Sequence, residues 1–560
     1  MSGNLVVARA LSRQGLEHCF GIIGVPIIEL GFAIQAEGIN YYGYRNEQGA
    51  SYSAGAVGYL TGKPGICLCV SGPGMINAVT GLANAWANGW PMILIVGSSD
   101  LAQNAKGAFQ ECDQISLTKP YVKFAVKITS AKQIPQVISK AVRLSVVGRP
   151  GPVYIEIPGD VLTETIDLDS LEFPQFNQVL PLSLAPTQLI QQAVQQIKTS
   201  KNPLVIIGKG AGYSRAENDV LQLIQSTQLP FLPTPMGKGV VSDLHPCCAA
   251  PARSFILQNA DLILLIGARL NWILHFGEPP RFNKNVKIIH IEICPEEFDT
   301  NVKGSVNLFG DIGLITKQLV QELQGYNCRQ IQADWWKSIK EKIDKNVLVS
   351  QKLISQNDEK QRITYYSALG IIQSMLPKDF IYVGEGANTM DIGRTVINQL
   401  QPRTKLDAGT FGTMGIGIPF CIAAKCTNPQ KPVVGILGDS AFGFSAMEIE
   451  TAIRYNLPFV VIILNNNGIF SGVEDLPEEI NAHNIPPNAL KPNTRYEKLA
   501  DAFGGVGLFV KTHNELKLAL EQAFSKSDVL HIINVMIDPN GQRKEQEFSW
   551  LTRKDPLPKF

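Results

Sequence analysis

Short apolar runs alternate with helix-length segments along most of this chain, and that alternation restricts its fold more than any other feature. In residues 1–165 the strand candidates are NYYGY, GICLCV, PMILIVGS and GPVYIEIP, and helical segments begin near Glu47 and Met75. Because parallel strands need a long crossover connection, usually a helix, this order predicts a parallel sheet. The opening residues, MSGNLVVARALSRQGLEHCFGIIG, have helical spacing, and we expect them to form the first helix of the domain.

The alternation returns twice, so we expect an α/β protein with three doubly wound parallel-sheet domains. A chain of 560 residues is longer than one hydrophobic core usually allows. The first domain is expected at 1–165 and the second at 185–325, after the proline-containing linker FPQFNQVLPLSLAP. A charged helical segment, DWWKSIKEKIDKNVLVSQKLISQNDEKQR, leads to the third domain at 363–545, and residues 546–560 form a tail. The third domain contains the strand candidates FIYVGEG, PVVGILGD, FVVIILNN and LHIINVMI.

Charge and composition argue against several classes of function. The 50 Lys and Arg residues nearly balance the 49 Asp and Glu residues, so no overall field attracts nucleic acid or an acidic membrane. The ten cysteines include no CxxC pair and the seven histidines no HxxxH or HExxH spacing, which favours buried free thiols over a zinc site. No apolar run approaches the roughly 20 residues that span a bilayer. Together with DPLPKF, which differs from the peroxisomal tripeptide, these features favour the cytoplasm.

Polar residues follow two neighbouring strand candidates in the third domain. Asp439 ends VVGILGD, and two asparagines, residues 465 and 466, end FVVIILNN, with a third at 467. Because the carboxyl ends of parallel strands share one edge of a sheet, these side chains are expected to meet there. Their oxygens suit Mg²⁺, and the N–H groups of Ser440 and Ala441, at a helix start, suit phosphate oxygens. The alternative is that Asp439 caps the helix and the asparagines form a polar turn.

The stretch from Gly438 to Gly468 resembles the metal-binding motif of the thiamine diphosphate enzymes, in which GD is followed by a strand-helix-strand unit and NN. Asn466 follows Asp439 by 27 positions, which fits that motif. The resemblance implies thiamine diphosphate and Mg²⁺ as cofactors, with the metal bound by Asp439, the Asn466 side chain and the Gly468 carbonyl. Ser440 stands where the broad family commonly has glycine.

The same resemblance implies further cofactor contacts. Glu47, in YRNEQGASYS, matches the glutamate that hydrogen-bonds the aminopyrimidine and favours the imino tautomer that removes the thiazolium proton. An isolated glutamate in the first turn of a helix would instead be explained by its favourable interaction with the helix dipole. In DAGTFGTMGIG, Gly412 and Met414 match the carbonyl acceptor and the wedge under the bent cofactor, and Asn388 in GEGANTMD matches a donor to the diphosphate.

Over nearly its full length the chain resembles the 2-hydroxyacyl-CoA lyases, with oxalyl-CoA decarboxylase as a close relative. The segments that show this include VSGPGMINAVTGLANAWANGWP, GARLNWILHFGEPPRF, GEGANTMDIGRT and FSWLTR. The resemblance implies cleavage of a 2-hydroxyacyl-CoA to formyl-CoA and an aldehyde, or the reverse condensation. Oxalyl-CoA decarboxylation and, more distantly, acetolactate-synthase-like carboligation are the alternatives. A regulatory ligand-binding protein would be favoured if Glu47 were absent.

Phe109 and Gln110 distinguish the two closest activities. The decarboxylase pattern has a tyrosine and an acid at these positions, whereas an apolar ring and a neutral amide suit an alkyl chain and a hydroxyl group. We expect Gln110 to orient the hydroxyl or aldehyde oxygen. The equally weighted alternative is a polar residue at the start of a helix.

Three further expectations come from the resemblance. The family joins domains of two subunits around each cofactor, which implies at least a homodimer and favours a homotetramer. The tail residues Ser549, Thr552 and Arg553 match a segment that covers the active site and contacts the acyl-CoA. Lys209, Arg269 and Glu292 match an ADP-contacting region of the decarboxylase, in which an aspartate replaces the glutamate. A tight strand-to-helix turn explains the glycines around Lys209 at least as well as phosphate binding does.

Overall fold

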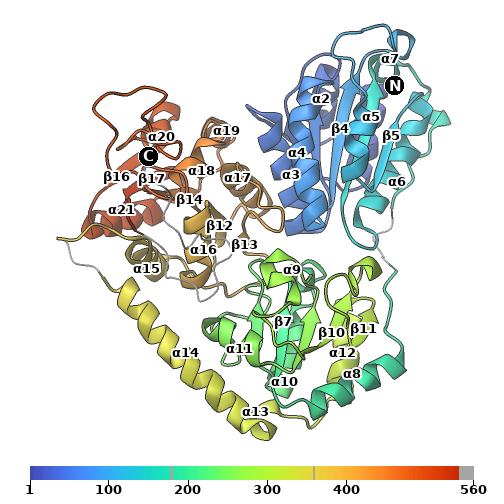
Figure 1. Cartoon of the computed structure of the whole chain (residues 1–560). Coiled ribbons are helices and arrows are strands. Elements are labelled where there is room, and N and C mark those ends of the chain that lie inside the picture. The colour runs from blue at the N-terminus through green and yellow to red at the C-terminus, as the bar shows by residue number, and fades with distance from the viewer. Residues whose placement is uncertain (177–180, 357–359, 542–560) are drawn as a thin grey trace.

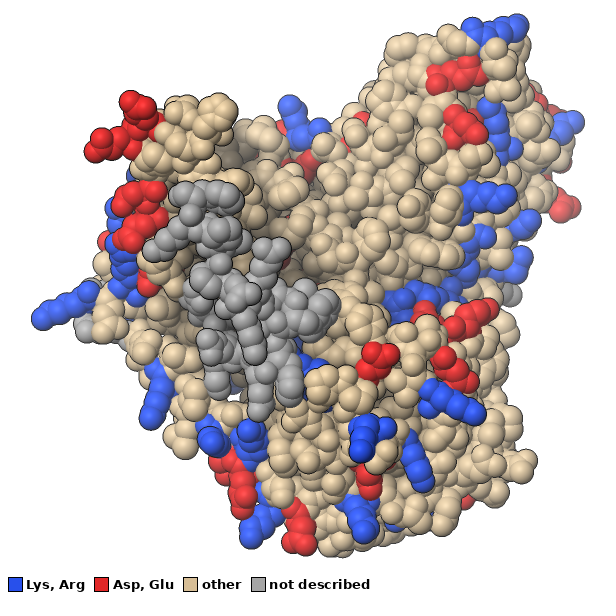
Figure 2. Space-filling view, in the orientation of Figure 1, with Lys and Arg blue, Asp and Glu red and all other residues tan. Residues whose placement is uncertain are grey.

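A computed structural model describes residues 1–176, 181–356 and 360–541. Three parallel sheets with flanking helices confirm the expected fold class, and Figure 1 shows their domains arranged around a common centre. All ten cysteines are free thiols, six of them buried. Within the described ranges, no helix is both long and apolar enough to cross a membrane. Acidic and basic side chains are interspersed on the face in Figure 2, as the balanced composition predicts.

The N-terminal domain has a six-stranded sheet in the order β2-β1-β3-β4-β6-β5. Its strands are β1 His18–Gly21, β2 Asn40–Gly43, β3 Gly65–Cys69, β4 Met92–Ser98, β5 Phe124–Lys127 and β6 Pro152–Pro158. Its helices are α1 Gly3–Arg13, α2 Ile28–Ala36, α3 Glu47–Thr61, α4 Pro73–Asn88, α5 Gln114–Thr118, α6 Ile134–Val146 and α7 Gly159–Thr163. The prediction that residues 1–24 form one helix was wrong, because α1 ends at Arg13 and the buried strand β1 follows it.

The central domain has a five-stranded sheet in the order β11-β10-β9-β7-β8. Its strands are β7 Pro203–Ile207, β8 Phe231–Pro233, β9 Leu262–Ile266, β10 Lys287–Glu292 and β11 Val306–Phe309. Its helices are α8 Thr187–Thr199, α9 Lys209–Tyr213, α10 Glu217–Thr227, α11 Arg253–Asn259 and α12 Ile312–Glu322. The short α13 (Cys328–Ile331) and the long α14 (Ala333–Ile354) then lead to the C-terminal domain along the outside of the molecule (Figure 1).

The C-terminal domain repeats the six-stranded plan in the order β13-β12-β14-β15-β17-β16. Its strands are β12 Ile381–Glu385, β13 Lys405–Leu406, β14 Val433–Gly438, β15 Val460–Asn465, β16 Val506–Val510 and β17 His531–Met536. Its helices are α15 Tyr365–Met375, α16 Ala387–Val396, α17 Gly417–Thr427, α18 Asp439–Gly443, α19 Glu448–Arg454, α20 Lys498–Phe503 and α21 His513–Ser525. The segment between β14 and β15 forms two short helices, α18 and α19.

One hydrophobic core is continuous between the N-terminal and C-terminal domains, because α3 packs against α17. The rings of Trp90 and Phe420 lie 5.6 Å apart across this boundary, and the Ser53 hydroxyl donates to the Pro419 carbonyl at 2.7 Å. Figure 1 shows α17 and α19 on the side of the C-terminal domain that faces the N-terminal domain. The N-terminal and C-terminal domains are therefore held together by a shared apolar interface.

Candidate active site

Glu47 lies at the carboxyl edge of the N-terminal sheet, as the first residue of α3. The Asn46 side chain caps this helix by accepting a hydrogen bond from the Gln48 N–H at 2.8 Å, as Asn does at helix starts. The Glu47 carboxylate is half-buried and accepts from the Asn77 side chain on α4 at 3.1 Å. A Cβ on Gly74 would lie 3.2 Å from Glu47 Oε1, so glycine at this position leaves room for the carboxylate.

Gln110 lies at the same sheet edge, beside the turn between β3 and α4. The Ser71 hydroxyl contacts its side-chain oxygen at 3.4 Å, and a Cβ on Gly72 would come within 2.8 Å of its main-chain oxygen. Gln110 has a φ of 56° and precedes α5 by four residues, so it is a turn residue and not the start of a helix. Its neighbour Phe109 is 72% exposed.

Gln114, which the sequence analysis did not select, fixes this turn. Its side chain is buried, and its Oε1 accepts from the Gly72 N–H at 3.0 Å. The turn that approaches both Glu47 and Gln110 is therefore held from beneath by a buried amide. No sequence signal separated this glutamine from an ordinary polar residue in the first turn of a helix.

Asp439 and Asn466 meet at the carboxyl edge of the C-terminal sheet. Strands β14 and β15 are parallel neighbours, with Gly438 opposite Leu464, so the residues that follow them emerge side by side. The Gly468 N–H donates to Asp439 Oδ2 and to Asn466 Oδ1, both at 3.2 Å. Two buried side-chain oxygens thus converge on one donor, as a shared ligand site requires.

The Asp439 carboxylate is buried, and burial raises its pKa to about 6. The groups that oppose this shift are main-chain N–H groups, including that of Ser440, which donates at 2.9 Å. The adjacent Ala441 is buried in α18, a helix of five residues. Over the described residues no cluster of three His, Cys, Asp or Glu side chains could hold a metal. The donor set is instead one carboxylate with amide and main-chain oxygens, which fits a hard divalent cation.

Asn388 borders this edge from α16. Its Nδ2 donates to the Phe470 carbonyl at 2.9 Å, in the loop that follows Asn466. Its Oδ1 is buried and has no hydrogen-bond partner among the described residues. A buried amide oxygen without a partner is costly, and as an acceptor it would be satisfied by a donor or a cation, whereas the Nδ2 group is the part of this amide that could donate to a phosphate oxygen.

Gly412 and Met414 lie in the segment 407–417, which the structure holds at several points. Gly412 has a φ of 71° and open space where a Cβ would be. Met414 is half-buried, while the hydroxyl of Thr413 donates to Asn84 Oδ1 on α4 at 2.9 Å. This segment therefore joins the C-terminal domain to the helix that also contacts Glu47.

Glu385, at the end of β12, was missed by the sequence analysis. Its buried carboxylate accepts from the main-chain N–H groups of Gly415 and, at 2.7 Å, Gly417. Burial raises its pKa to about 7, and the N–H donors oppose that rise. Its position in GEGANTMD, directly after an apolar run, was the signal that could have selected it.

Lys209, Arg269 and Glu292 line a cavity of about 450 Å³ between the three domains. Lys209 Nζ donates to Asn88 Oδ1 at 2.9 Å, and Glu292 accepts from the Ile293 N–H at 2.8 Å. Burial lowers the pKa of the Lys209 ammonium and raises that of the Glu292 carboxyl. A Cβ on Gly208 would lie 2.0 Å from the Gly267 carbonyl oxygen, so the tight turn alone requires that glycine.

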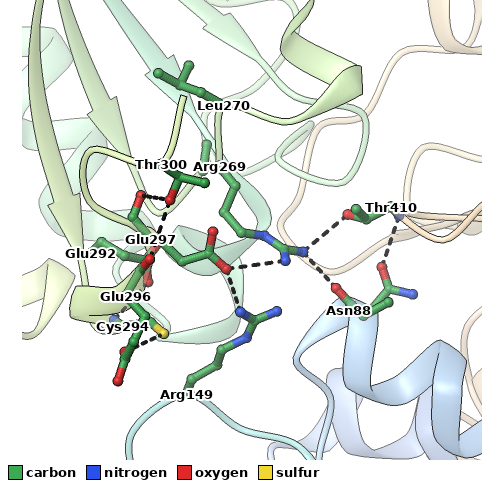
Figure 3. A network of polar contacts seen from close by, with 12 residues as sticks. Asn88, Arg149, Arg269, Leu270, Glu292, Cys294, Glu296, Glu297, Thr300 and Thr410 are labelled. Atoms are coloured by element: carbon green, nitrogen blue, oxygen red, sulfur yellow. Dashed lines mark hydrogen bonds and ion pairs between the residues drawn. The ribbon is translucent and has the colours of Figure 1, made fainter. Parts of the chain in front are cut away.

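Two arginines approach this cavity from different domains, as Figure 3 shows. Arg149 and Arg269 both contact Glu297 Oε1, at 2.5 Å and 3.4 Å. Arg269 also reaches the Thr410 hydroxyl at 3.3 Å. Three basic side chains, Lys209, Arg149 and Arg269, therefore line the cavity together with the carboxyl groups of Glu292 and Glu297. The tail residues Ser549, Thr552 and Arg553 lie outside the described residues.

Three family models match the chain. The N-terminal TPP binding domain of the thiamine pyrophosphate enzymes matches residues 1–117, their central domain residues 190–319, and their C-terminal TPP binding domain residues 384–535. Each match falls on one of the three sheets described above.

Curated relatives extend over nearly the whole chain. The 2-hydroxyacyl-CoA lyase 1 of Mus musculus is 47% identical and covers 99% of this chain and 97% of its own length. The 2-hydroxyacyl-CoA lyase of Oryza sativa subsp. japonica is 41% identical, over 96% of both chains. The oxalyl-CoA decarboxylase of Escherichia coli (strain K12) is 40% identical, over 96% of this chain and 95% of its own.

Proposed function

Because this chain belongs to the thiamine pyrophosphate enzymes, in the family of the 2-hydroxyacyl-CoA lyases, we propose that it cleaves 2-hydroxyacyl-CoA to formyl-CoA and an aldehyde. The observation that carries the proposal is the 47% identity to a lyase over 99% of the chain. The reverse condensation of formyl-CoA with a carbonyl compound follows from the same chemistry. When bound, thiamine diphosphate supplies the electron sink for breaking the carbon–carbon bond beside the thioester carbonyl.

The C-terminal sheet edge would hold the cofactor's diphosphate through Mg²⁺. Asp439, the Asn466 side chain and the Gly468 carbonyl are the proposed metal ligands, and the first two already share one N–H donor. The Ser440 and Ala441 N–H groups and the Asn388 amide are the proposed contacts to the diphosphate. This set supplies one negative charge and several neutral oxygens, which leaves coordination positions for phosphate and water.

The N-terminal sheet edge would act on the other end of the cofactor. Glu47 would exchange a proton with the aminopyrimidine, while the Gly412 carbonyl accepts from its amino group and Met414 supports the ring. Phe109 and Gln110 belong to the loop before α5, and Gln110 contacts Ser71 in the β3–α4 turn. There an exposed ring and an amide suit an alkyl chain and a hydroxyl group.

Replacing Gln110 by alanine is expected to lower kcat/KM for 2-hydroxyacyl-CoA by at least about tenfold, because a donor to the reacting oxygen is lost. Affinity for thiamine diphosphate should stay unchanged, since Gln110 has no proposed contact to it. The exposed Gln103 in the same loop provides the control, and Gln103→Ala should behave as the wild type. A Gln110→Ala enzyme with an unchanged rate would contradict this role.

A substrate panel tests the proposed function. The protein is incubated with thiamine diphosphate, Mg²⁺ and 2-hydroxyacyl-CoAs of differing chain length, and formyl-CoA and aldehyde are measured together. Equal amounts of the two products are expected. Release of carbon dioxide from oxalyl-CoA without aldehyde formation would favour the decarboxylase, and acetolactate formed from pyruvate would favour the carboligase.

We further propose at least a homodimer, and a homotetramer as the favoured assembly, with an acyl-CoA thioester as the substrate. Large apolar side chains are exposed beside both sheet edges, including Ile76 on α4, Phe109, and Phe444 and Met447 between α18 and α19. Figure 2 shows a broad uncharged area between the N-terminal and C-terminal domains. An exposed apolar surface of this kind marks an interaction site.

ADP is the proposed ligand of the cavity between the three domains. Because a charge-assisted hydrogen bond contributes about 1.5–3 kcal/mol, Arg149→Ala should weaken ADP binding about tenfold or more. Titration calorimetry measures this, with Arg143→Ala, an exposed arginine on the neighbouring α6, as the control. Equal ADP affinity in the two variants would show that Arg149 does not contact ADP. The absence of binding heat with the wild type would exclude ADP as the ligand.

A further inference from the structure

The main chain that leads into Glu47 is bound by the C-terminal domain. Arg454 Nη2 donates to the Gly43 carbonyl at 2.7 Å, and the Gly43 N–H donates to the Tyr455 hydroxyl at 2.7 Å. The N–H groups of Arg45 and Asn46 both donate to Glu448 Oε1, at 3.2 Å and 3.1 Å. Four hydrogen bonds from α19 and the residue after it therefore hold the turn between β2 and α3.

We propose that α19 positions Glu47, and that Glu448 is the principal positioning residue. This inference rests on the proposed catalytic role of Glu47. Glu448 is not among the proposed substrate or cofactor contacts. It acts through the two N–H groups of the residues that immediately precede Glu47. Its effect is to set the direction in which the first turn of α3 leaves the sheet.

The environment of Glu448 shows that this contact is built into the fold. The side chain is 2% exposed, and its Oε2 accepts from the Thr451 hydroxyl at 2.7 Å. A Cβ on Gly49 would lie 3.4 Å from Oε1 and 3.2 Å from the Tyr44 ring, so α3 approaches the carboxylate closely. A buried carboxylate is costly unless hydrogen bonds satisfy it, and here main-chain N–H groups and a hydroxyl do so. The buried Glu448 contact therefore differs from a surface ion pair, which contributes little to folding stability.

The remainder of α3 is held by other contacts. The Ser53 hydroxyl binds the Pro419 carbonyl, and the buried face of the helix belongs to the core shared with α17. The hydrogen bonds to Glu448, in contrast, bind the residues that immediately precede the first turn of α3, which contains Glu47. Because a displacement of about 1 Å at a reacting group can reduce a rate about 10²-fold, the loss of this support should appear in catalysis before it appears in folding.

The test compares Glu448→Ala with Glu448→Gln in the full-length protein. Alanine leaves the Arg45 and Asn46 N–H groups without their acceptor. Glutamine keeps an oxygen for both and can donate to the Thr451 hydroxyl through its amide. We expect Glu448→Ala to lower kcat about 10²-fold, and more than it lowers affinity for thiamine diphosphate, whose diphosphate anchor is in the C-terminal domain. Glu448→Gln should recover most of the rate.

Amide hydrogen exchange on the cofactor-free chain gives a readout that does not require activity. Residues 43–47 should exchange faster in Glu448→Ala than in the wild type, while residues 53–60 exchange as before. Glu521→Ala, which removes an exposed glutamate on α21 of the same domain, is the matched control, and neither kcat nor exchange at residues 43–47 should change appreciably.

Unchanged exchange at residues 43–47 in Glu448→Ala would overturn the proposal, as would a loss of rate that Glu448→Gln does not recover. A failure of the Glu47 assignment itself would look different. In that case Glu47→Gln would retain activity, whereas the faster exchange in Glu448→Ala would persist.

Discussion

Asp439→Asn is expected to abolish Mg²⁺-dependent binding of thiamine diphosphate and to reduce kcat/KM by at least about 10³-fold. Asp439 is the one charged group in the proposed ligand set, and neutral amide and carbonyl oxygens alone bind Mg²⁺ poorly. Asparagine keeps the shape of the side chain and an oxygen that can accept from the Ser440 N–H. The substitution therefore removes charge while conserving volume. Calorimetry with Mg²⁺ and thiamine diphosphate measures the loss directly.

Thermal unfolding separates loss of the metal from loss of the fold. Without ligands, Asp439→Asn should unfold no earlier than the wild type, because the replaced carboxylate is buried and burial penalises its charge. A ligand that binds only the folded state raises Tm, so Mg²⁺ with thiamine diphosphate should stabilise the wild type and not the variant. Asp528→Ala, at an exposed position of the same domain, is the control. Full ligand stabilisation of Asp439→Asn would exclude Asp439 as a metal ligand.

The strands with long apolar runs could be predicted because they are buried on both faces. β4, β9, β14 and β15 each read as a continuous hydrophobic stretch, which is typical of parallel sheets covered by helices. β1 was missed because its four residues contain only two strongly apolar side chains, between a histidine and a glycine. Its identity as a strand depends on pairing with β2 and β3 on its two sides, and such long-range contacts leave no local pattern.

The same distinction applies to the site. Asp439 and Asn466 could be selected from the sequence as site residues because each lies at the end of an apolar run, and neighbouring parallel strands bring their carboxyl ends together. Gln114 and Glu448 could not, because they bind main-chain N–H groups of segments that lie 42 and 403 residues away in the sequence. Any residue type except proline can supply a main-chain N–H group, so the sequence does not reveal the partner. Residues that position the chain are therefore harder to predict than those that bind the cofactor.

Glu47→Gln is expected to lower kcat by about 10²–10⁴-fold, the usual contribution of a positioned acid or base. Glutamine is almost the same size and its oxygen can still accept from Asn77, so the sheet edge should be preserved. What disappears is the ability to exchange a proton with the aminopyrimidine. Single-turnover cleavage of 2-hydroxyacyl-CoA at saturating cofactor measures the chemical step. Glu17→Gln, an exposed glutamate of the same domain, is the control.

Comparison of the two variants tests whether the two sheet edges have separate roles. Asp439→Asn should remove cofactor binding and activity together, whereas Glu47→Gln should retain most of the Mg²⁺-dependent affinity, because the proposed diphosphate anchor lies in the other domain. Saturating cofactor would then fail to rescue Glu47→Gln, since the missing function is proton transfer and not binding. If Glu47→Gln kept more than about a tenth of the wild-type kcat, its loss would be too small for a positioned acid or base. The N-terminal edge would then serve only to enclose the cofactor.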